Sequence, residues 1–404
     1  MKKKFFVTFL ALAILFTFSL TVNAAEFRIG VPVALTGIFG KAGALVRDAY
    51  TFWAEMVNKR GGINGYKVKL IFYDDKSTPA TSAKLVEKLI TTDKVDLILG
   101  GYGSSQVFAA SAIAEKYKYP MISGGASSNK LFERGFKYYF ATLGKATEEV
   151  KGCVDVFTSV KPKPKTVAIV GADILFTSLA CEGYKKYCKE NGFKIVHFEL
   201  FPIRLQDYNT MLGKAKKKNP DILLVGSHLM VAMKTIKAMK EIDFSPKAVA
   251  FSYGPTVPDF VKGLGKDAEY VYAASEWTPN LPYKDKYFGS ASDFNQNYYK
   301  RFKRYPDYVE AAAAAGALAQ QIALENLKIK PPVKQKDRVA LMKELHKINI
   351  VTFYGPIKFG EDGANIAHPP VAVQVQNGKL VNVYPPEGAN AKPIYPMPKW
   401  NERK

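Results

Sequence analysis

Two short segments of the chain place glycine and serine directly after an apolar run. "LILGGYGSS" at residues 97–105 and "MISGGASSN" at 121–129 each predict a buried strand that ends in a Gly/Ser loop. Free backbone N–H groups at the start of a helix, with hydroxyls beside them, suit an anion such as a carboxylate. A serine at such a place also serves as a plain helix cap, so one loop alone leaves both readings open. Their repetition after two successive strands favours an anion-holding site.

Patterns of known catalytic sites are missing or weak. The first loop lacks the Gly-Lys-Ser/Thr ending of a phosphate loop, and Gln106 stands where the dinucleotide fingerprint needs glycine. Ser127 and Lys130 match the Ser-x-x-Lys pair of some acyl-transfer enzymes, but the companion motifs are absent. The four histidines have no metal-ligand spacing, and Asp74 and Asp75 are more simply explained as loop caps. We therefore predict a protein that is not an enzyme and has no metal or cofactor.

The elements that must position these loops alternate between strand and helix patterns. Strands are expected at 28–34, 66–75, 95–100, 119–123, 166–171, 193–200, 221–226, 248–253 and 269–275, with amphipathic helices between most of them. Three further helices (290–304, 308–328 and 336–347) and a hairpin (371–383) follow. This order predicts an α/β fold with two Rossmann-like lobes and parallel central sheets. Ligands bind beyond the carboxyl ends of such strands, where both Gly/Ser loops lie.

The start of the chain and its charge point to export. Three lysines at 2–4, an apolar stretch at 5–20, and small residues at Val22 and Ala24 predict a signal peptide cleaved near residue 24, with an uncleaved anchor as the alternative. The formal net charge is +22, but the lysines are scattered over expected loops and helix ends. This distribution favours a solvated surface over a nucleic-acid site. We therefore expect a soluble protein in the periplasm that binds no nucleic acid.

The three cysteines allow two interpretations. Export permits a disulfide. Cys181 and Cys188 lie roughly 10 Å apart along a predicted helix, which is too far for a bridge without distortion, whereas Cys153 could pair with either. Three buried thiols are the alternative.

Several segments resemble one family. "NKRGGINGYKVKLIFYDD" (58–75), "GGYGSSQ" (100–106), "YPMISGGASSNKLFERG" (119–135) and "GPIKFGEDG" (355–363) are similar to segments of periplasmic leucine/isoleucine/valine-binding proteins of ABC importers, which are type I periplasmic binding proteins. The resemblance implies two lobes joined by three hinge crossovers near 143–147, 275–279 and 350–357. It places lobe 1 at 25–144 plus 278–350, lobe 2 at 145–277 plus 351–384, and a Pro-rich surface arm at 385–404.

The resemblance also implies a set of ligand-binding residues. Ser104 matches the serine that holds the ligand carboxylate. Gly125 matches the carbonyl for the α-amine, and Ser127 matches a hydroxyl and N–H donor. In the second lobe, Phe176 and His228 stand where the family has tyrosines, and Tyr253 stands where it has the glutamate that pairs with the ammonium group. Tyr102, Ser105 and Ala126 complete the expected site.

The function implied by the resemblance is delivery of a small hydrophobic carboxylate to an ABC permease in the inner membrane by a monomeric binding protein. The ligand would be a branched-chain or other amino acid, or an amine-free aromatic or aliphatic carboxylate, because no acid replaces the glutamate at Tyr253. Two alternatives stay open: a ligand-sensing module for a receptor, and an exported hydrolase built on Ser127 and Lys130.

Overall fold

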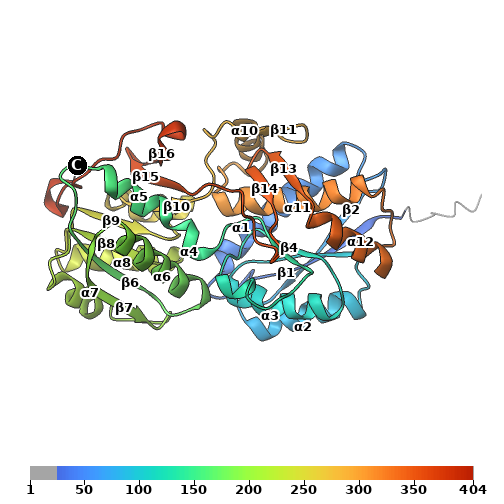
Figure 1. Ribbon diagram of the computed structural model, residues 1–404, viewed down its shortest axis with the longest axis horizontal. Coiled ribbons are helices and arrows are strands. Elements are labelled where there is room, and N and C mark those ends of the chain that lie inside the picture. The colour runs from blue at the N-terminus through green and yellow to red at the C-terminus, as the bar shows by residue number, and fades with distance from the viewer. Residues whose placement is uncertain (1–24, 404) are drawn as a thin grey trace, which may run out of the picture.

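The computed structural model describes residues 25–403, which form two lobes side by side (Figure 1). The predicted signal peptide lies outside the described residues. The first lobe has a five-stranded sheet in the order β2-β1-β3-β4-β5, and every neighbouring pair is parallel. Its strands are β1 (Phe27–Val33), β2 (Val68–Asp74), β3 (Leu97–Leu99), β4 (Met121–Ser123) and β5 (Tyr139–Ala141).

Helices cover this sheet, and one close contact fixes the second Gly/Ser loop. The helices are α1 (Gly40–Lys59), α2 (Pro79–Thr91), α3 (Ser104–Lys116), α10 (Ala291–Phe302), α11 (Tyr308–Asn326) and α12 (Gln335–Leu345). The alanine-rich α11 is almost completely buried. A Cβ at Gly124 would lie 2.3 Å from the backbone nitrogen of Ala313, so only glycine allows the loop after β4 to approach α11.

The second lobe has a seven-stranded sheet in the order β16-β15-β10-β9-β8-β6-β7. The neighbours from β10 to β7 pair in parallel, whereas β15 and β16 form the expected hairpin and join antiparallel at β10. The strands are β6 (Thr166–Ala172), β7 (Lys194–Phe201), β8 (Ile222–Gly226), β9 (Ala248–Phe251), β10 (Tyr272–Ser275), β15 (Val371–Gln376) and β16 (Lys379–Tyr384). The helices are α4 (Ala146–Glu149), α5 (Lys151–Ser159), α6 (Leu175–Glu190), α7 (Tyr208–Lys216), α8 (Leu229–Glu241) and α9 (Pro258–Leu264).

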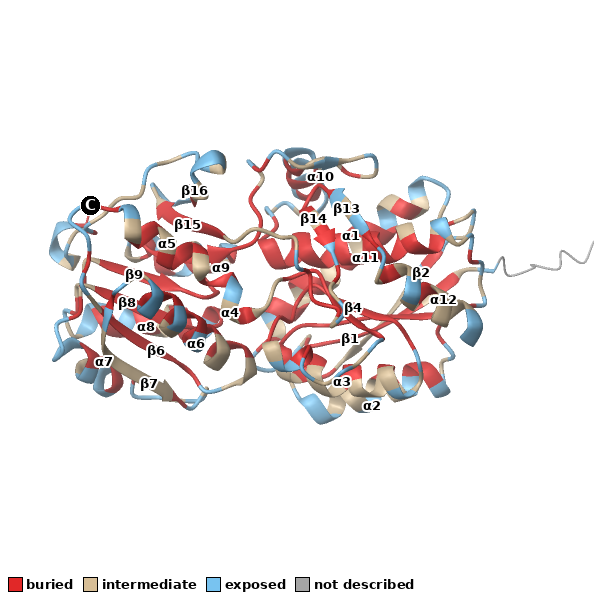
Figure 2. Ribbon diagram, viewed as in Figure 1, coloured by how far each residue is buried: buried red, intermediate tan, exposed pale blue. Residues whose placement is uncertain are grey.

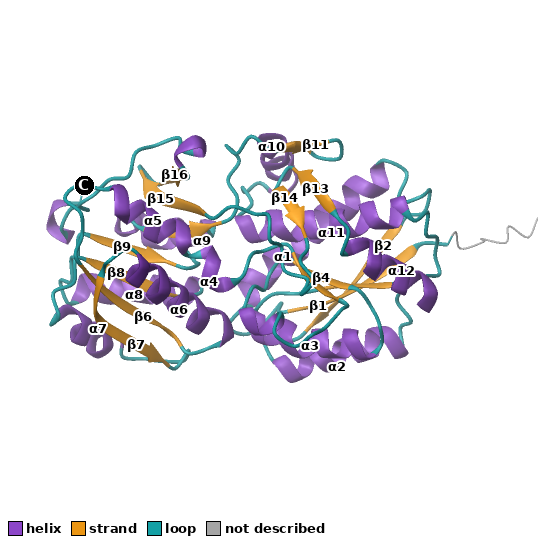
Figure 3. Ribbon diagram, viewed as in Figure 1, coloured by secondary structure: helices purple, strands orange, loops and turns teal. Residues whose placement is uncertain are grey.

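In both lobes the strands form the middle layer (Figure 3), and the buried residues concentrate on them and on the helix faces toward them (Figure 2). Two short antiparallel pairs complete the fold: β11 (Lys284–Asp285) with β12 (Gly289–Ser290), and β13 (Asn349–Thr352) with β14 (Gly355–Lys358). No helix in residues 25–403 has the length and apolar character needed to cross a membrane.

The third crossover lies later in the chain than the expected 350–357. The backbone N–H of Ala141 in β5 donates to the carbonyl of Gly363, and the side chain of Asn365 donates to the carbonyl of Thr142. These bonds keep the chain on the first lobe through Asn365. It therefore passes to the second lobe over residues 366–370, just before β15.

The C-terminal segment 385–404, expected to be an extended surface arm, packs against the second lobe as far as it is described. The backbone N–H of Met397 donates to the carbonyl of Lys247, and the indole of Trp400 donates to the carbonyl of Phe244. Met397 is itself buried. The segment contains only two short 3-10 helices, Pro386–Gly388 and Trp400–Glu402, and it contacts the second lobe through the bonds above.

The three cysteines are free, buried thiols. Burial raises the pKa of Cys181 and of Cys188 to about 12, because a thiolate is poorly solvated there. The structure therefore agrees with the interpretation of three buried thiols and not with a disulfide.

One buried carboxyl group connects the three crossovers between the lobes. Glu276, in the second crossover, accepts a hydrogen bond from the N–H of Gly144 in the first at 2.9 Å. Its other oxygen accepts from the hydroxyl of Tyr354 at 2.5 Å. The carbonyl of Tyr354 lies 3.2 Å from Nε2 of His368, which belongs to the third crossover. Burial raises the pKa of Glu276 to about 7.

Candidate functional site

A small cavity lies between the lobes, at the carboxyl ends of their central strands. Its volume is about 20 Å³, which is room for roughly one water molecule. The first lobe and the first crossover contribute Tyr102, Ser104, Gly125, Ala126, Ser127, Leu143, Tyr308 and Val309. The second lobe contributes Phe176, His228 and Tyr253, together with Glu149 from α4, the helix next to the first crossover. We call this space the inner cavity.

Hydrogen bonds hold the two Gly/Ser loops together on the first-lobe side. The N–H of Gly103 donates to the carbonyl of Gly125 at 2.9 Å. Gly103 has φ = +92°, which glycine adopts without strain. The hydroxyl oxygen of Ser104 accepts from the N–H groups of Ser127 at 3.2 Å and of Ser128 at 3.1 Å. With both acceptor positions used, Ser104 has its O–H proton free to donate to a bound anion.

The second-lobe side of the cavity is aromatic. Phe176 lies in the first turn of α6, His228 precedes α8, and Tyr253 follows β9. The Phe176 and His228 rings are 5.3 Å apart, and those of His228 and Tyr253 are 6.2 Å apart. Burial lowers the pKa of His228 to about 3, because an imidazolium would lose its hydration there. His228 is therefore neutral at physiological pH.

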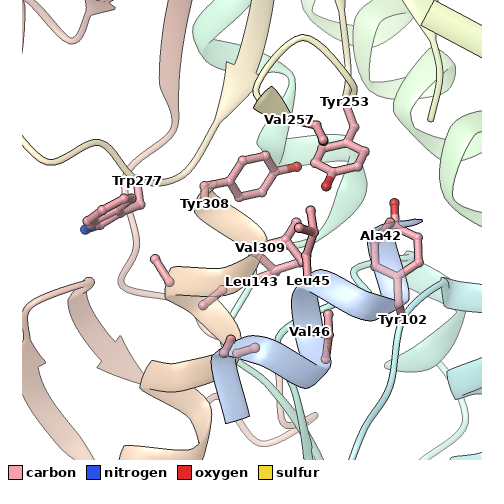
Figure 4. Packing of buried hydrophobic residues seen from close by; sticks show 14 of the residues in the cluster. Ala42, Leu45, Val46, Tyr102, Leu143, Tyr253, Val257, Trp277, Tyr308 and Val309 are labelled. Carbon is pink, nitrogen blue, oxygen red and sulfur yellow. The ribbon is translucent and has the colours of Figure 1, made fainter. Parts of the chain in front are cut away.

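Two buried hydrogen bonds join the lobes across the cleft. The hydroxyl of Tyr102 lies 2.7 Å from Nδ1 of His228, and the hydroxyl of Tyr253 donates to Oδ2 of Asp307 at 2.7 Å. Figure 4 shows Tyr308 and Tyr253 close together above Val309 and Leu143, with Tyr102 to the right of Val309. The lobes thus touch, and a ligand larger than water can enter only if they separate.

A second cavity of about 490 Å³ adjoins the inner one, because Tyr102 and His228 line both. We call it the outer cavity. Its walls carry apolar side chains with three cations at the edge, namely Lys41, Arg204 and Lys234.

The structure brings together most of the residues expected from the sequence. Tyr102, Ser104, Gly125, Ala126, Ser127, Phe176, His228 and Tyr253 all line the inner cavity, whereas Ser105 is half-buried and does not. The proposed hydrolase pair does not assemble. Lys130 points to the surface, where its ammonium pairs with Glu133 at 2.6 Å. Asp74 and Asp75 cap the loop that follows β2, as expected: Asp74 accepts from the N–H of Lys76 at 2.8 Å, and Asp75 accepts from the N–H of Ser77 at 2.9 Å.

Sequence reasoning missed four residues that line the cavity: Leu143, Glu149, Tyr308 and Val309. Leu143 and Glu149 come from the first crossover and α4, and the other two from the N-terminus of α11. The sequence had one signal, the capping box formed by Asp307 and Glu310, which marks the start of α11. Nothing local distinguished Glu149 from its neighbour Glu148.

Comparison with known proteins supports this architecture. The model of a family described as "Periplasmic binding protein" matches residues 26–379. A Leu/Ile/Val-binding protein homolog from Brucella abortus is 25% identical over 397 residues, which cover 92% of this chain and 94% of the relative. The leucine-, isoleucine-, valine-, threonine- and alanine-binding protein of Pseudomonas aeruginosa is 27% identical, over 54% of this chain and 58% of its own length.

Solved structures show the same fold. A branched-chain amino acid transporter substrate binding protein from Streptococcus pneumoniae, in complex with isoleucine, superposes with a TM-score of 0.77 at 21% identity, covering 92% of this chain and 100% of that one. A solute binding protein from R. palustris, in complex with benzoate, gives a TM-score of 0.77 at 15% identity, over 91% and 97% of the two chains. With its two lobes, its cleft and a family match over most of its length, the chain belongs to the periplasmic binding proteins, in the type I group that includes the Leu/Ile/Val-binding proteins.

Proposed function

We propose that this protein is a periplasmic solute-binding protein that carries a small hydrophobic carboxylate to an ABC permease in the inner membrane. The observation that carries this proposal is the inner cavity, which both lobes line at the carboxyl ends of their strands. Ser104 offers a hydroxyl donor and the opposite wall offers aromatic rings, which together suit a carboxylate with an apolar substituent. The relatives solved with isoleucine and with benzoate bind ligands of this kind.

The two hydrogen bonds across the cleft indicate how binding would proceed. An open form would admit the ligand between the lobes, and closure would bury it between Ser104 and the aromatic wall. A permease that recognises the closed form would then receive loaded protein. This role requires no chemical step, in line with the protein being a carrier rather than an enzyme.

A thermal-shift screen of the mature protein tests the proposal. The panel contains branched-chain and aromatic amino acids, together with the carboxylic acids that lack only the amine. A ligand that binds only the folded state raises the melting temperature by mass action, by an amount that grows with concentration. We expect at least one panel member to do so at micromolar to millimolar concentration. No shift with any member would refute the proposed ligand class.

A further inference from the structure

The carboxyl group of Glu149 is buried without a partner. Glu149 is the last residue of α4, the short helix that follows the first crossover, and its side chain is 3% exposed. Neither carboxyl oxygen has a hydrogen-bond partner, and no lysine, arginine or histidine in the described chain forms an ion pair with it. A buried carboxylate in this state is costly, and a cation is the partner that would stabilise it most.

The other buried carboxyl groups near the cleft already have partners. Glu276 accepts from Gly144 and Tyr354, and Asp307 accepts from the hydroxyl of Tyr253 and the N–H of Glu310. Glu149 alone lines the inner cavity. The unsatisfied acid therefore faces the space that a ligand would enter.

The electrostatics of Glu149 agree with a missing cation. Burial raises the pKa of its carboxyl well above the usual value, and repulsion from Glu276 acts in the same direction. The hydroxyl of Ser127 lowers this pKa, but the two carboxyl oxygens of Glu149 still have no hydrogen-bond partner. A bound ammonium group would favour the ionised carboxyl and offset the repulsion.

The inner cavity thus offers an anion-holding and a cation-holding group. Ser104 presents its hydroxyl proton on the side of the two Gly/Ser loops, and Glu149 presents a free carboxyl from the hinge helix. We propose that Glu149 binds the ammonium group of the ligand and makes the protein selective for amino acids over the matching amine-free acids. This inference rests on the proposed function. It places the ammonium-binding residue on α4. The position after β9, where the family has a glutamate, holds Tyr253, whose hydroxyl donates to Asp307.

Isothermal titration calorimetry at pH 7.5 with two matched ligand pairs tests the inference. The pairs are L-leucine with 4-methylpentanoate, and L-phenylalanine with 3-phenylpropanoate. In the unmodified protein, the better-binding pair should favour the amino acid by at least about tenfold, as expected for a charge-assisted hydrogen bond in a buried site. In Glu149→Gln, the amino acid should lose at least about tenfold in affinity, while the amine-free acid changes by less than about threefold.

Glu148→Gln is the matched control, because Glu148 is the preceding residue on the same helix. Its carboxyl is about half exposed and pairs at the surface with Lys186. We expect this variant to bind every ligand within about twofold of the unmodified protein, because an exposed pair contributes little. Melting curves without ligand check that both variants fold, and the matched-pair comparison in the unmodified protein needs no variant.

The outcomes separate this inference from the proposed function. Amine-free acids that bind as tightly as the amino acids, or a Glu149→Gln variant that weakens both members of a pair equally, would overturn the role of Glu149. Either result would leave the proposed carboxylate carrier in place. Absence of binding by every ligand in the unmodified protein would overturn both.

Discussion

The two walls of the cleft differ in how they are built. On the first lobe, the polar groups belong to the backbone and to serines, and hydrogen bonds between the loops fix them, such as those from Ser127 and Ser128 to Ser104. On the second lobe, the wall consists of rings that contact one another with few polar bonds, among them Phe176 and His228. The difference indicates a division of roles. We propose that the first wall orients the ligand carboxylate and that the second selects the shape of the apolar group that fits.

The largest effect is expected on the polar wall. In Ser104→Ala the hydroxyl is lost and the N–H groups of Ser127 and Ser128 lose their acceptor. We expect ligand affinity to fall by about 1.5–3 kcal/mol, measured by calorimetry. Ser105→Ala is the control, because Ser105 follows directly in the chain but does not line the cavity. Equal losses in both variants would contradict the assignment of the carboxylate site to Ser104.

A second test removes one of the two hydrogen bonds that the aromatic wall makes to the first lobe. Tyr253→Phe leaves the ring in place and deprives the buried Asp307 of one donor. We expect a loss of about 1–2 kcal/mol in the free energy of unfolding, measured in urea, because the carboxyl remains buried.

Tyr139→Phe provides the control for Tyr253→Phe. Tyr139 is equally buried, but its hydroxyl has no hydrogen-bond partner within residues 25–403, so its removal should not destabilise the protein. If Tyr253→Phe proves as stable as Tyr139→Phe, then the bond to Asp307 contributes nothing to the contact between the lobes.

The pH dependence of binding tests whether His228 must be neutral when the cleft is closed. Its pKa is about 3 in this structure and about 6.5 when solvated, as in an open form. Above pH 6.5 His228 is neutral in both forms, so it does not affect the free energy of closure. Below pH 6.5 only the open form is protonated at His228, and closure becomes less favourable by up to about 1.4 kcal/mol per pH unit. The groups that face His228 are the rings of Phe39, Tyr102, Phe176 and Tyr253.

The measurement compares affinities at pH 7.5, 6.5 and 5.5 in the unmodified protein and in His228→Phe. We expect the unmodified protein to weaken toward pH 5.5 more steeply than the variant. Glu276 also titrates near the upper end of this range. Because both proteins contain it, its contribution to the pH dependence of affinity cancels in the comparison. Identical profiles would mean that His228 is not buried on closure.

The smallest effect is expected at the rim, where Lys41 of the first lobe pairs with Asp259 of the second at 3.1 Å. Both side chains are well exposed, so solvent and salt screen the pair. Lys41→Met should change ligand affinity by no more than about fivefold, and less at high salt. A loss as large as that of Ser104→Ala would mean that the rim contributes to closure as much as the walls inside.

Much of the architecture is readable from sequence because it depends on local patterns. The alternation of apolar strands with amphipathic helices predicts the two parallel sheets, and the Gly/Ser loops mark the strand ends where the ligand site forms. Glu149 shows where this reasoning stops. Glu148 and Glu149 are identical in type and adjacent in the chain, yet one reaches solvent and the other is buried against the cleft. The packing of α4 distinguishes them, because it buries the side chain of Glu149 and leaves that of Glu148 at the surface.

The third crossover illustrates the same limit. The segment "GPIKFGEDG" at 355–363 is recognisable, but its neighbours in space are not encoded locally. The hydrogen bond from Ala141 to Gly363 holds it on the first lobe over a separation that no sequence window spans. Long-range pairing therefore places this crossover later in the chain. Helix α12 before it and the β15–β16 hairpin after it agree with expectation, whereas the short β13–β14 pair was not expected.

The carboxyl group of Glu276 has a consequence for how the lobes move. Because it is bonded to the first crossover and, through Tyr354, to the third, the three connecting segments cannot bend independently. We therefore expect the lobes to open in one coupled movement of the three crossovers. We therefore expect substitutions at this joint to change the rate of ligand release, and substitutions in the walls to change which ligand binds.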